Sequence, residues 1–205
     1  LMTTGREREA FEALRAFGEL RKDGLIPNCF DNGTGEAEYN TVDAPLWYMQ
    51  ACAAYVEATG DLIGARDVLL PACRDIIAAY RGGTKFGIGV DASDGLVCAG
   101  DESTQLTWMD ARRDGVVFTP RHGKPVEINA LWYNALCLLG DGNLASKVKE
   151  SFVKAFWISP YRGLADVVTG ALTRDVSTRI NQIFAVSLPH SPLNEEQQRA
   201  VMEVV

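Results

Sequence analysis

The chain has 205 residues, 47% of them hydrophobic and 23% charged, which is typical of a folded globular domain and excludes collagen, coiled-coil and low-complexity proteins. Its 20 basic and 27 acidic side chains give a net charge of −7, which argues against a nucleic-acid partner because a phosphate backbone needs a clustered basic face. The longest uncharged stretches, residues 44–56 and 128–140, are shorter than the roughly 20 apolar residues that cross a bilayer, and no secretory signal opens the chain. We therefore expect no membrane contact and a cytoplasmic location.

Helical periodicity dominates the first third of the chain. A first helix is predicted over residues 6–22, where apolar side chains recur at helical spacing before the stop signal Asp23-Gly24. Residues 27–41 are predicted to form a loop. Asp43 is then placed as the N-cap of a helix that runs to Ala58, and this helix is apolar on nearly all sides, so we expect it to be buried.

The middle of the chain is predicted to contain both helices and a β-hairpin. After Gly60-Asp61 we expect a helical segment that breaks at Pro71 before a further run over residues 72–80. Apolar residues then alternate around Asp94-Gly95, which predicts a short β-hairpin insertion near residues 86–98. The later helices are expected over residues 126–139, 144–156 and 179–188, and from residue 195 onward.

These elements predict an all-α fold of antiparallel helical hairpins. The successive pairs share no fixed repeat period, so a closed or partly closed toroid is preferred over a solenoid or a bundle. The last helix is still running at Val205 and no cap closes it, so we expect residues 1–205 to be a single domain and the central part of a larger one. Helix faces left uncovered around residues 1–2 and 180–205 are expected to promote self-association.

The residue types that build common catalytic sites are scarce. The five cysteines are widely spaced and form no C-x-x-C pair, which favours buried thiols over disulfides or a metal site. With only His122 and His190 present, a histidine zinc site or a Ser-His-Asp triad is hard to assemble. Carboxylate chemistry is therefore the main option.

Two of the three polar loop segments contain aspartates beside tryptophans. In residues 36–43, Asp43 is either a plain N-cap or a carboxylate that binds sugar hydroxyls while Trp47 stacks on the apolar face of the ring. In residues 100–112, Trp108 precedes Asp110 by two positions. Sites are commonly built in such loops next to rigid helices.

The third polar segment covers residues 119–129 and ends in a helix that carries Trp132. Glu127 is either a first-turn acid favoured by the helix dipole, worth under ~1 kcal/mol, or a functional carboxylate. Arg121 and Lys124 nearby are expected to lower the pKa of Glu127, which suits ligand binding or a general base better than a general acid.

Several ordered blocks of sequence carry a family resemblance. The blocks are Tyr39–Trp47 (YNTVDAPLW), Gln105–Ala111 (QLTWMDA), Thr119–Arg121 (TPR) and Gly123–Leu136 (GKPVEINALWYNAL), with shorter ones at Gly24–Asn28 and Asn181–Ala185. In order and across essentially the whole chain, they resemble the C-terminal glucosidase domain of glycogen debranching enzymes, the amylo-α-1,6-glucosidase family.

The resemblance implies an (α/α)6 toroid, incomplete in this chain, that removes α-1,6-linked glucose at glycogen or limit-dextrin branch points with inversion. The family's catalytic aspartate falls on Asp110 of the Thr-Trp-Met-Asp block, so the resemblance implies a general acid there, and we expect Trp108 and Met109 to desolvate it. The glutamate expected as general base has no counterpart here. An α-glucan partner is implied, and no metal or organic cofactor is expected, since inverting hydrolysis needs only water and two carboxyl groups.

The candidate site is thus assigned as a set of nine residues. Asp110 and Glu127 are the candidate catalytic residues, and the candidate substrate-binding residues are Asp43, Trp47, Gln105, Trp108, Arg121, Lys124 and Trp132. Two other function classes stay open. One is a catalytically incompetent carbohydrate-binding or scaffold protein with the same wall, and the other is an epimerase or lyase that would use His122 or His190 as a proton-transfer group.

Overall fold

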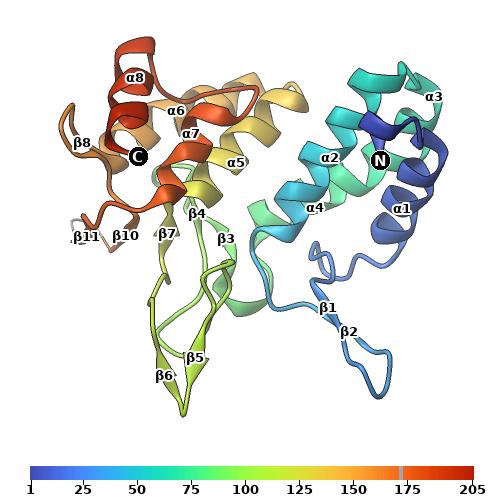
Figure 1. Cartoon of the computed structure of the whole chain (residues 1–205), viewed down its shortest axis with the longest axis horizontal. Helices are drawn as coiled ribbons and strands as arrows, with labels where there is room; N and C mark the ends of the chain where they lie inside the picture. The colour runs from blue at the N-terminus through green and yellow to red at the C-terminus, as the bar shows by residue number, and fades with distance from the viewer. Residues whose placement is uncertain (171–172) are drawn as a thin grey trace.

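The computed structural model describes residues 1–170 and 173–205, and helices make up about half of the chain (Figure 1). The α-helices are α1 (Glu7–Glu19), α2 (Ala44–Thr59), α3 (Leu62–Gly64), α4 (Leu70–Gly82), α5 (Val126–Leu138), α6 (Gly142–Phe156), α7 (Phe184–Ser187) and α8 (Glu195–Val204). Three short 3₁₀ helices are η1 (Met2–Thr4), η3 (Lys85–Gly87) and η4 (Ile180–Ile183), and η2 (Ala65–Leu69) is a π-helix.

Very short strands line the loops, so the all-α expectation is wrong in this respect. The antiparallel pairs are β1 (Cys29–Phe30) with β2 (Ala37–Glu38), β3 (Gly89–Val90) with β4 (Val97–Cys98), β5 (Arg112–Arg113) with β6 (Val116–Val117), and β8 (Trp157–Ser159) with β9 (Gly163–Leu164). A three-stranded antiparallel sheet has β10 (Val167–Thr169) between β7 (Lys124–Pro125) and β11 (Thr173–Asp175). Strands of two or three residues are too short for an alternating pattern to predict them, except where a turn signal marks the hairpin.

Most predicted helices are confirmed, with adjusted ends. The predictions over residues 6–22, 126–139 and 144–156 correspond to α1, α5 and α6, and the hairpin predicted near residues 86–98 is β3–β4. The segment 179–188 is divided between η4 and α7. Pro71 does not break the chain, because it lies in the first turn of α4, where its missing N–H group costs no hydrogen bond. The change of helix type occurs just before it, at η2.

Helix α5 lies at the centre of the core. It contacts α2, α6 and α7, and every residue from Val126 to Leu136 is buried. Helices α1, α4, α6 and α8 are amphipathic. Of these, α6 packs directly on α5, whereas α1 packs on α2 and α8 on α7. The apolar sequence of α5 therefore matches its position.

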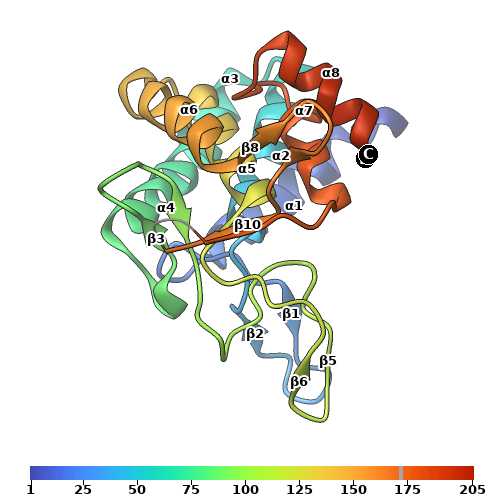
Figure 2. The same ribbon diagram turned by 90° about the vertical axis from the view of Figure 1, so that its left-hand side faces the viewer.

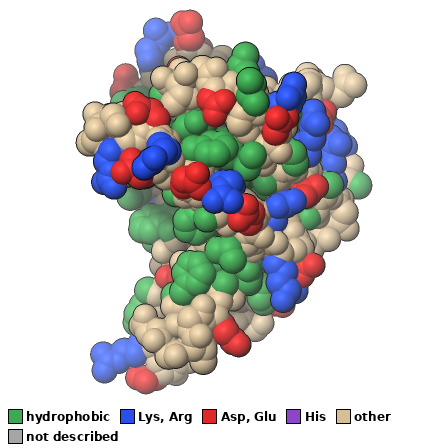
Figure 3. Space-filling model, turned by 90° about the vertical axis from the view of Figure 1, so that its right-hand side faces the viewer, with side chains coloured by type: hydrophobic (Ala, Val, Ile, Leu, Met, Phe, Trp, Pro, Cys, Tyr) green, Lys and Arg blue, Asp and Glu red, His purple; other side chains and the backbone are tan. Residues whose placement is uncertain are grey.

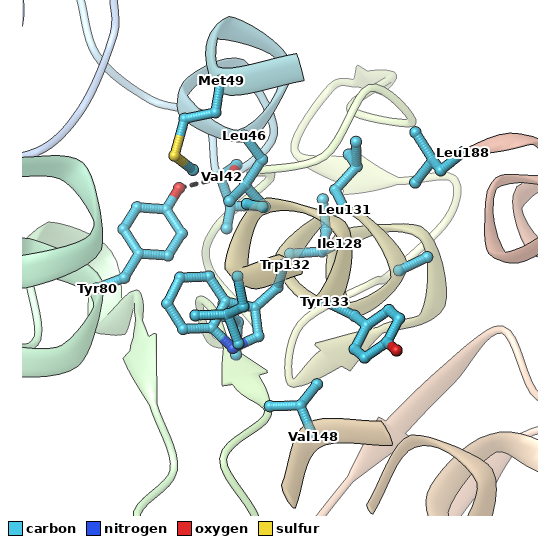
Figure 4. Packing of buried hydrophobic residues seen from close by; sticks show 14 of the residues in the cluster. Val42, Leu46, Met49, Tyr80, Ile128, Leu131, Trp132, Tyr133, Val148 and Leu188 are labelled. Carbon is cyan, nitrogen blue, oxygen red and sulfur yellow. Dashed lines mark hydrogen bonds between the residues drawn. The ribbon is translucent and has the colours of Figure 1, made fainter. Parts of the chain in front are cut away.

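Two side chains of α5 attach the β3–β4 hairpin to the core. Trp132 is fully buried and stacks on Tyr80 with ring centroids 5.9 Å apart (Figure 4). It donates its indole N–H to the Gly95 carbonyl oxygen at 3.0 Å. Tyr80 in turn donates its hydroxyl to the Val42 carbonyl oxygen at 2.7 Å. Asn129 accepts from the Val97 backbone N–H at 2.7 Å and donates to the Val97 carbonyl oxygen at 3.1 Å.

The cysteine expectation is confirmed in part. Cys52 and Cys73 are buried and Cys98 and Cys137 are half-buried, but Cys29 is exposed on β1, and all five are free. Within the described ranges, no helix is long and apolar enough to cross a bilayer.

The loops that carry the three polar segments gather at one end of the molecule. The N-termini of α2 and α5 point toward this end, and the hairpins β1–β2 and β5–β6 project from it, away from α6 and α8 (Figures 1 and 2). Two candidate site residues lie at this end: Asp43 directly precedes α2, and Asp110 lies on the loop that leads to β5.

We predict that the attachment of β4 to α5 is worth more than a surface contact. Asn129→Ala should lower the free energy of unfolding by about 2–4 kcal/mol, because it leaves the buried Val97 N–H and C=O groups without their partner. Asn143→Ala, at an exposed position of α6, is the matched control and should change it by less than about 0.5 kcal/mol. Urea unfolding of the two variants measures the difference, and equal effects would contradict the assignment.

Candidate active site

Two of the three polar loop segments are joined by a backbone hydrogen bond. The Val42 N–H donates to the Leu106 carbonyl oxygen at 2.9 Å, and the Thr41 hydroxyl oxygen lies 3.3 Å from the same carbonyl oxygen. Residues 39–43 and 105–110 therefore meet at the start of α2, although some 60 residues separate them in sequence.

Asp43 occupies the N-cap position of α2 but makes no side-chain capping hydrogen bond. Its carboxylate instead accepts a hydrogen bond from the Thr41 hydroxyl, and the side chain is half-buried. The plain N-cap interpretation is thus wrong. One turn along α2, Trp47 is 36% exposed and packs edge-on against Phe184 with centroids 5.3 Å apart. Asp43 and Trp47 both border an open groove between α1 and α2.

Trp108 and Asp110 lie on the surface of the second loop. Trp108 is 52% exposed and donates its indole N–H to Asn181 at 3.0 Å, while Asp110 is exposed. Asp110 is therefore not turned into the core, but the expected desolvation by Trp108 and Met109 is absent, because both neighbours leave its carboxylate in contact with solvent.

Asn181 holds the residues that precede Asp110, and sequence analysis did not assign it a role. It is fully buried, accepts from Trp108, and donates to Asp166 at 2.8 Å and to the Met109 sulfur at 3.4 Å. Asn181 thus connects the loop of Asp110 to a buried group of charges. The sequence feature that could have indicated a role for Asn181 is its place in the block Asn181–Ala185, one of the blocks that carry the family resemblance.

Arg121, Glu127 and Asp166 form a buried ion cluster at the start of α5. The guanidinium of Arg121 donates to both carboxylate oxygens of Glu127, and its Nε lies 2.8 Å from Asp166 Oδ2. All three side chains are at most 2% exposed. Arg179 reaches the cluster from outside, 3.1 Å from Asp166 and 2.7 Å from Asp175.

Burial dominates the protonation of Glu127 in this cluster. Loss of solvent raises the pKa of Glu127 above its ordinary value, and the hydrogen bonds and charge of Arg121 oppose that rise. This corrects the expectation that Arg121 and Lys124 lower the pKa. For Arg121, burial acts to lower the pKa, but Glu127 and Asp166 outweigh it and the pKa is raised. The guanidinium therefore stays charged.

Several predicted site residues have structural positions instead. Glu127 is enclosed, with both oxygens bound by Arg121, so it is not open to a catalytic water. Lys124 extends toward α6 and donates to Asp91 at 2.7 Å and to Asp94 at 2.6 Å, which ties β7 to the β3–β4 hairpin.

Two further predicted site residues, Trp132 and Gln105, are also engaged by the protein itself. Trp132 has no accessible surface and cannot stack on a sugar, so its assignment to substrate binding is wrong. Gln105 is half-buried and donates to the adjacent Thr104 carbonyl oxygen at 2.5 Å. Asp43, Trp47, Trp108 and Asp110 are thus at least partly accessible, on segments joined by the Val42–Leu106 hydrogen bond, whereas Arg121 and Glu127 are buried.

The remaining chemistry-bearing residues add no metal-binding group. His122 is half-buried in its loop, and His190 is exposed. In the part of the chain that the structure describes, no three His, Cys, Asp or Glu side chains are grouped to hold a metal ion. What this end of the molecule offers is the accessible carboxyl group of Asp110, on a loop held through Trp108 and Asn181, together with the exposed indoles of Trp47 and Trp108.

Comparison with known proteins identifies both a family and a fold. The family model described as amylo-alpha-1,6-glucosidase matches residues 1–205. The glycogen debranching enzyme of Saccharomyces cerevisiae is 29% identical over 189 residues, in a match that covers 66% of this chain and 12% of that enzyme. The chain therefore spans only a small part of the relative's length.

A solved structure supports the predicted architecture. A rhamnosidase from Klebsiella oxytoca with rhamnose bound matches 98% of this chain and 37% of that chain, with a TM-score of 0.69 and 15% identity. At this identity the likeness concerns the fold alone. It supports the arrangement of helical hairpins of a toroid glycosidase domain, and closure of the ring stays a prediction.

We predict that the buried cluster depends on its central cation. Arg121→Met should lower the free energy of unfolding by about 3–5 kcal/mol at neutral pH, because it leaves Glu127 buried without a partner. Without Arg121, Glu127 binds a proton more readily in the folded than in the unfolded chain, so the loss should be larger at pH 8 than at pH 5.

The matched control for Arg121→Met is Arg113→Met, since the side chain of Arg113 is 81% exposed. It should leave the free energy of unfolding within about 0.5 kcal/mol of the wild-type value at both pH values. Urea unfolding at the two pH values measures both variants, and a pH-independent loss for Arg121→Met would contradict the prediction.

Proposed function

The chain belongs to the amylo-alpha-1,6-glucosidase family, and we propose that it carries the general-acid side of a glycoside hydrolase site for α-1,6-linked glucose at glycogen or limit-dextrin branch points. The observation that carries the proposal is the position of Asp110, an accessible carboxyl group on a loop whose preceding residues are held by buried Asn181. An acid fixed in this way can meet a substrate oxygen without first ordering its own loop.

The proposed reaction is a single displacement with inversion. Asp110 donates a proton to the glycosidic oxygen as the bond from C1 of the branch glucose to that oxygen breaks. Water attacks C1 from the opposite face and loses its proton to a carboxylate about 6.5–9.5 Å from the acid. Free glucose and a debranched glucan are the products. We propose that this base comes from outside residues 1–205, since Glu127 is bound on both oxygens by Arg121.

We propose that the accessible residues around Asp110 bind the sugar. Trp47 and Trp108 expose indole faces for the apolar side of a pyranose ring, and the carboxylate of Asp43 can accept hydrogen bonds from hydroxyl groups. Gln105, half-buried in the second loop, adds an amide that can hydrogen-bond to hydroxyl groups. Arg121 supports the site from below, through Asp166 and Asn181.

A binding role without catalysis is the second candidate. It is favoured by one observation, the enclosure of Glu127, which leaves Asp110 without an accessible glutamate partner on α5. Such a chain would bind an α-glucan through the same aromatic and acidic residues and release no glucose.

We predict that, in a protein that also carries the general base, Asp110→Asn lowers glucose release from a phosphorylase limit dextrin by a factor of roughly 10²–10⁴, because the amide cannot donate the proton. Asp114→Asn is the matched control in the same loop. Its side chain is 90% exposed at the tip of β5–β6, and asparagine tolerates its positive φ of 51°, so release should be unchanged. Asp110→Asn with wild-type activity would refute the acid assignment. A protein that also carries the general base, and that binds limit dextrin without releasing glucose, would support the second candidate.

We also propose that apolar faces of this chain mediate self-association. The groove between α1 and α2 is lined by Ala10, Leu14, Phe17 and Ile26, and Figure 3 shows hydrophobic side chains gathered on that side of the molecule. Ile180 and Met202 are 60% and 57% exposed elsewhere. Apolar surface of this kind gains free energy when a second copy covers it.

Sedimentation velocity over a range of concentrations tests this proposal. The wild-type chain should sediment faster as its concentration rises, and Phe17→Glu in the groove should reduce the effect. Leu62→Glu, at a 70% exposed position outside the groove lining, is the control and should leave the association as it is. A monomer at all concentrations would refute the proposal.

A further inference from the structure

The turn between α4 and β3 holds a phenylalanine in a backbone conformation that disfavours it. The Ile88 N–H donates to the Lys85 carbonyl oxygen at 3.1 Å, and the two central residues, Phe86 and Gly87, have φ of 61° and 66°. This is a type I′ turn, whose central positions favour asparagine, aspartate and glycine. The left-handed conformation costs a residue with a Cβ about 1–2 kcal/mol relative to glycine.

Phe86 differs from the other strained positions of the described chain. The non-glycine residues with positive φ are Asp23, Phe86 and Asp114, and aspartate tolerates this region because its short side chain hydrogen-bonds locally. A phenyl ring offers no such compensation. Neighbouring hydrogen bonds hold the turn closed, from the Thr84 N–H to the Ile88 carbonyl oxygen at 2.8 Å and from the Thr84 hydroxyl to the Asp23 carbonyl oxygen at 2.6 Å.

Burial does not account for the ring. Phe86 is 43% exposed, whereas Phe152 and Phe156 in the core have no accessible surface. The chain therefore keeps an aromatic side chain at a position where the backbone conformation favours glycine and where only part of the ring is buried. Strained residues that the surrounding structure holds in place are concentrated at ligand-binding sites.

The turn is directly connected to the segments of the candidate active site. The Phe86 carbonyl oxygen accepts from the Gly100 N–H at 2.8 Å, at the start of the loop that leads to Asp110. The next residue back, Ala99, pairs with Gly123 through two hydrogen bonds of 2.8 and 2.9 Å, two positions from Arg121. The turn between α4 and β3 also lies in the same half of the molecule as the N-termini of α2 and α5 (Figure 1).

We propose that the exposed ring of Phe86 is a stacking platform for a glucose unit of the α-glucan chain, at a subsite away from the scissile bond. The inference rests on the proposed function, which supplies the class of ligand. Pyranose rings present an apolar C–H face that stacks on an aromatic ring, and polar neighbours then bind the hydroxyl groups at its edge.

The surroundings of Phe86 favour a sugar over a protein partner. Lys85, which directly precedes Phe86 in the turn, forms an ion pair with Asp23 at 3.1 Å. Asp101 is exposed on the loop that follows Gly100. A single aromatic ring among charged and glycine residues matches a carbohydrate subsite, whereas a protein interface requires a contiguous apolar patch.

The variant Phe86→Gly separates the two roles of the residue, because its predicted effects on stability and on binding have opposite signs. Glycine relieves the left-handed strain, so the midpoint of urea unfolding should rise. Loss of the ring should weaken binding to glycogen roughly three- to tenfold, the range expected for one aromatic stacking contact. Retardation of the chain in native gels that contain glycogen measures the binding without requiring hydrolysis.

Two further variants complete the experiment. Phe86→Trp keeps an aromatic face and should retain retardation, and Tyr161→Ala, at a 91% exposed tyrosine, is the matched control and should change neither quantity. A Phe86→Gly chain with unchanged retardation, or one that unfolds at lower urea, would overturn the proposal, because the ring would then serve only the fold.

The same gels separate this inference from the proposed function. A wild-type chain that glycogen retards, with the variant pattern above, supports the Phe86 subsite whether or not it releases glucose. The hydrolase is refuted separately, if a protein that also carries the general base releases no glucose. A wild-type chain that glycogen does not retard at all would overturn the subsite.

Discussion

The pairing of Arg121 with two buried carboxylates is the constraint on which the candidate active site depends. A charge out of contact with water must be matched by a partner at hydrogen-bond distance, so the positions of Glu127 and Asp166 around Arg121 are fixed within narrow limits. Each residue comes from a different segment, namely the start of α5, the loop before it, and the connection between β9 and β10. The need to pair the buried charge of Arg121 thus brings three segments together beneath the accessible part of the site.

Buried polar side chains of α5 hold other segments in place in the same way throughout the core. The helix is apolar on every side, and its buried polar residues each attach another segment. Glu127 attaches Arg121, Asn129 attaches β4, and Asn134 donates to Gln50 of α2 at 2.7 Å and accepts from the His190 backbone N–H at 3.2 Å. Apolar burial supplies the driving force for folding, whereas these few hydrogen bonds determine which loop lies against which turn of the helix.

The sequence predicts the helices well, because periodicity reports which faces are buried. It predicts the roles of single polar residues poorly. Trp132 and Glu127 stand in the longest of the resembling blocks, yet both are enclosed, since a motif does not show which side of a helix faces a solvent-filled site. Asp166 gave no signal, because an isolated aspartate between apolar residues has no pattern, and its partner Arg121 lies 45 positions earlier in sequence. Exposed Asp110 and Trp108, by contrast, follow from the loop position that the sequence indicated.

The site therefore combines a buried ion cluster with an accessible loop. Asn181 joins the two, since the same amide accepts a hydrogen bond from Trp108 on the loop and donates one to Asp166 in the cluster. A carboxyl group that must meet a substrate oxygen gains from this arrangement, because the geometry of its loop is set before substrate binds. The strained turn at Phe86 adds a second fixed point on the same loop, through the hydrogen bond to Gly100. The segment from Gly100 to Asp110 is thus held near both ends by hydrogen bonds, to Phe86 at Gly100 and to Asn181 at Trp108, while the Trp108 ring and the Asp110 carboxyl group stay exposed.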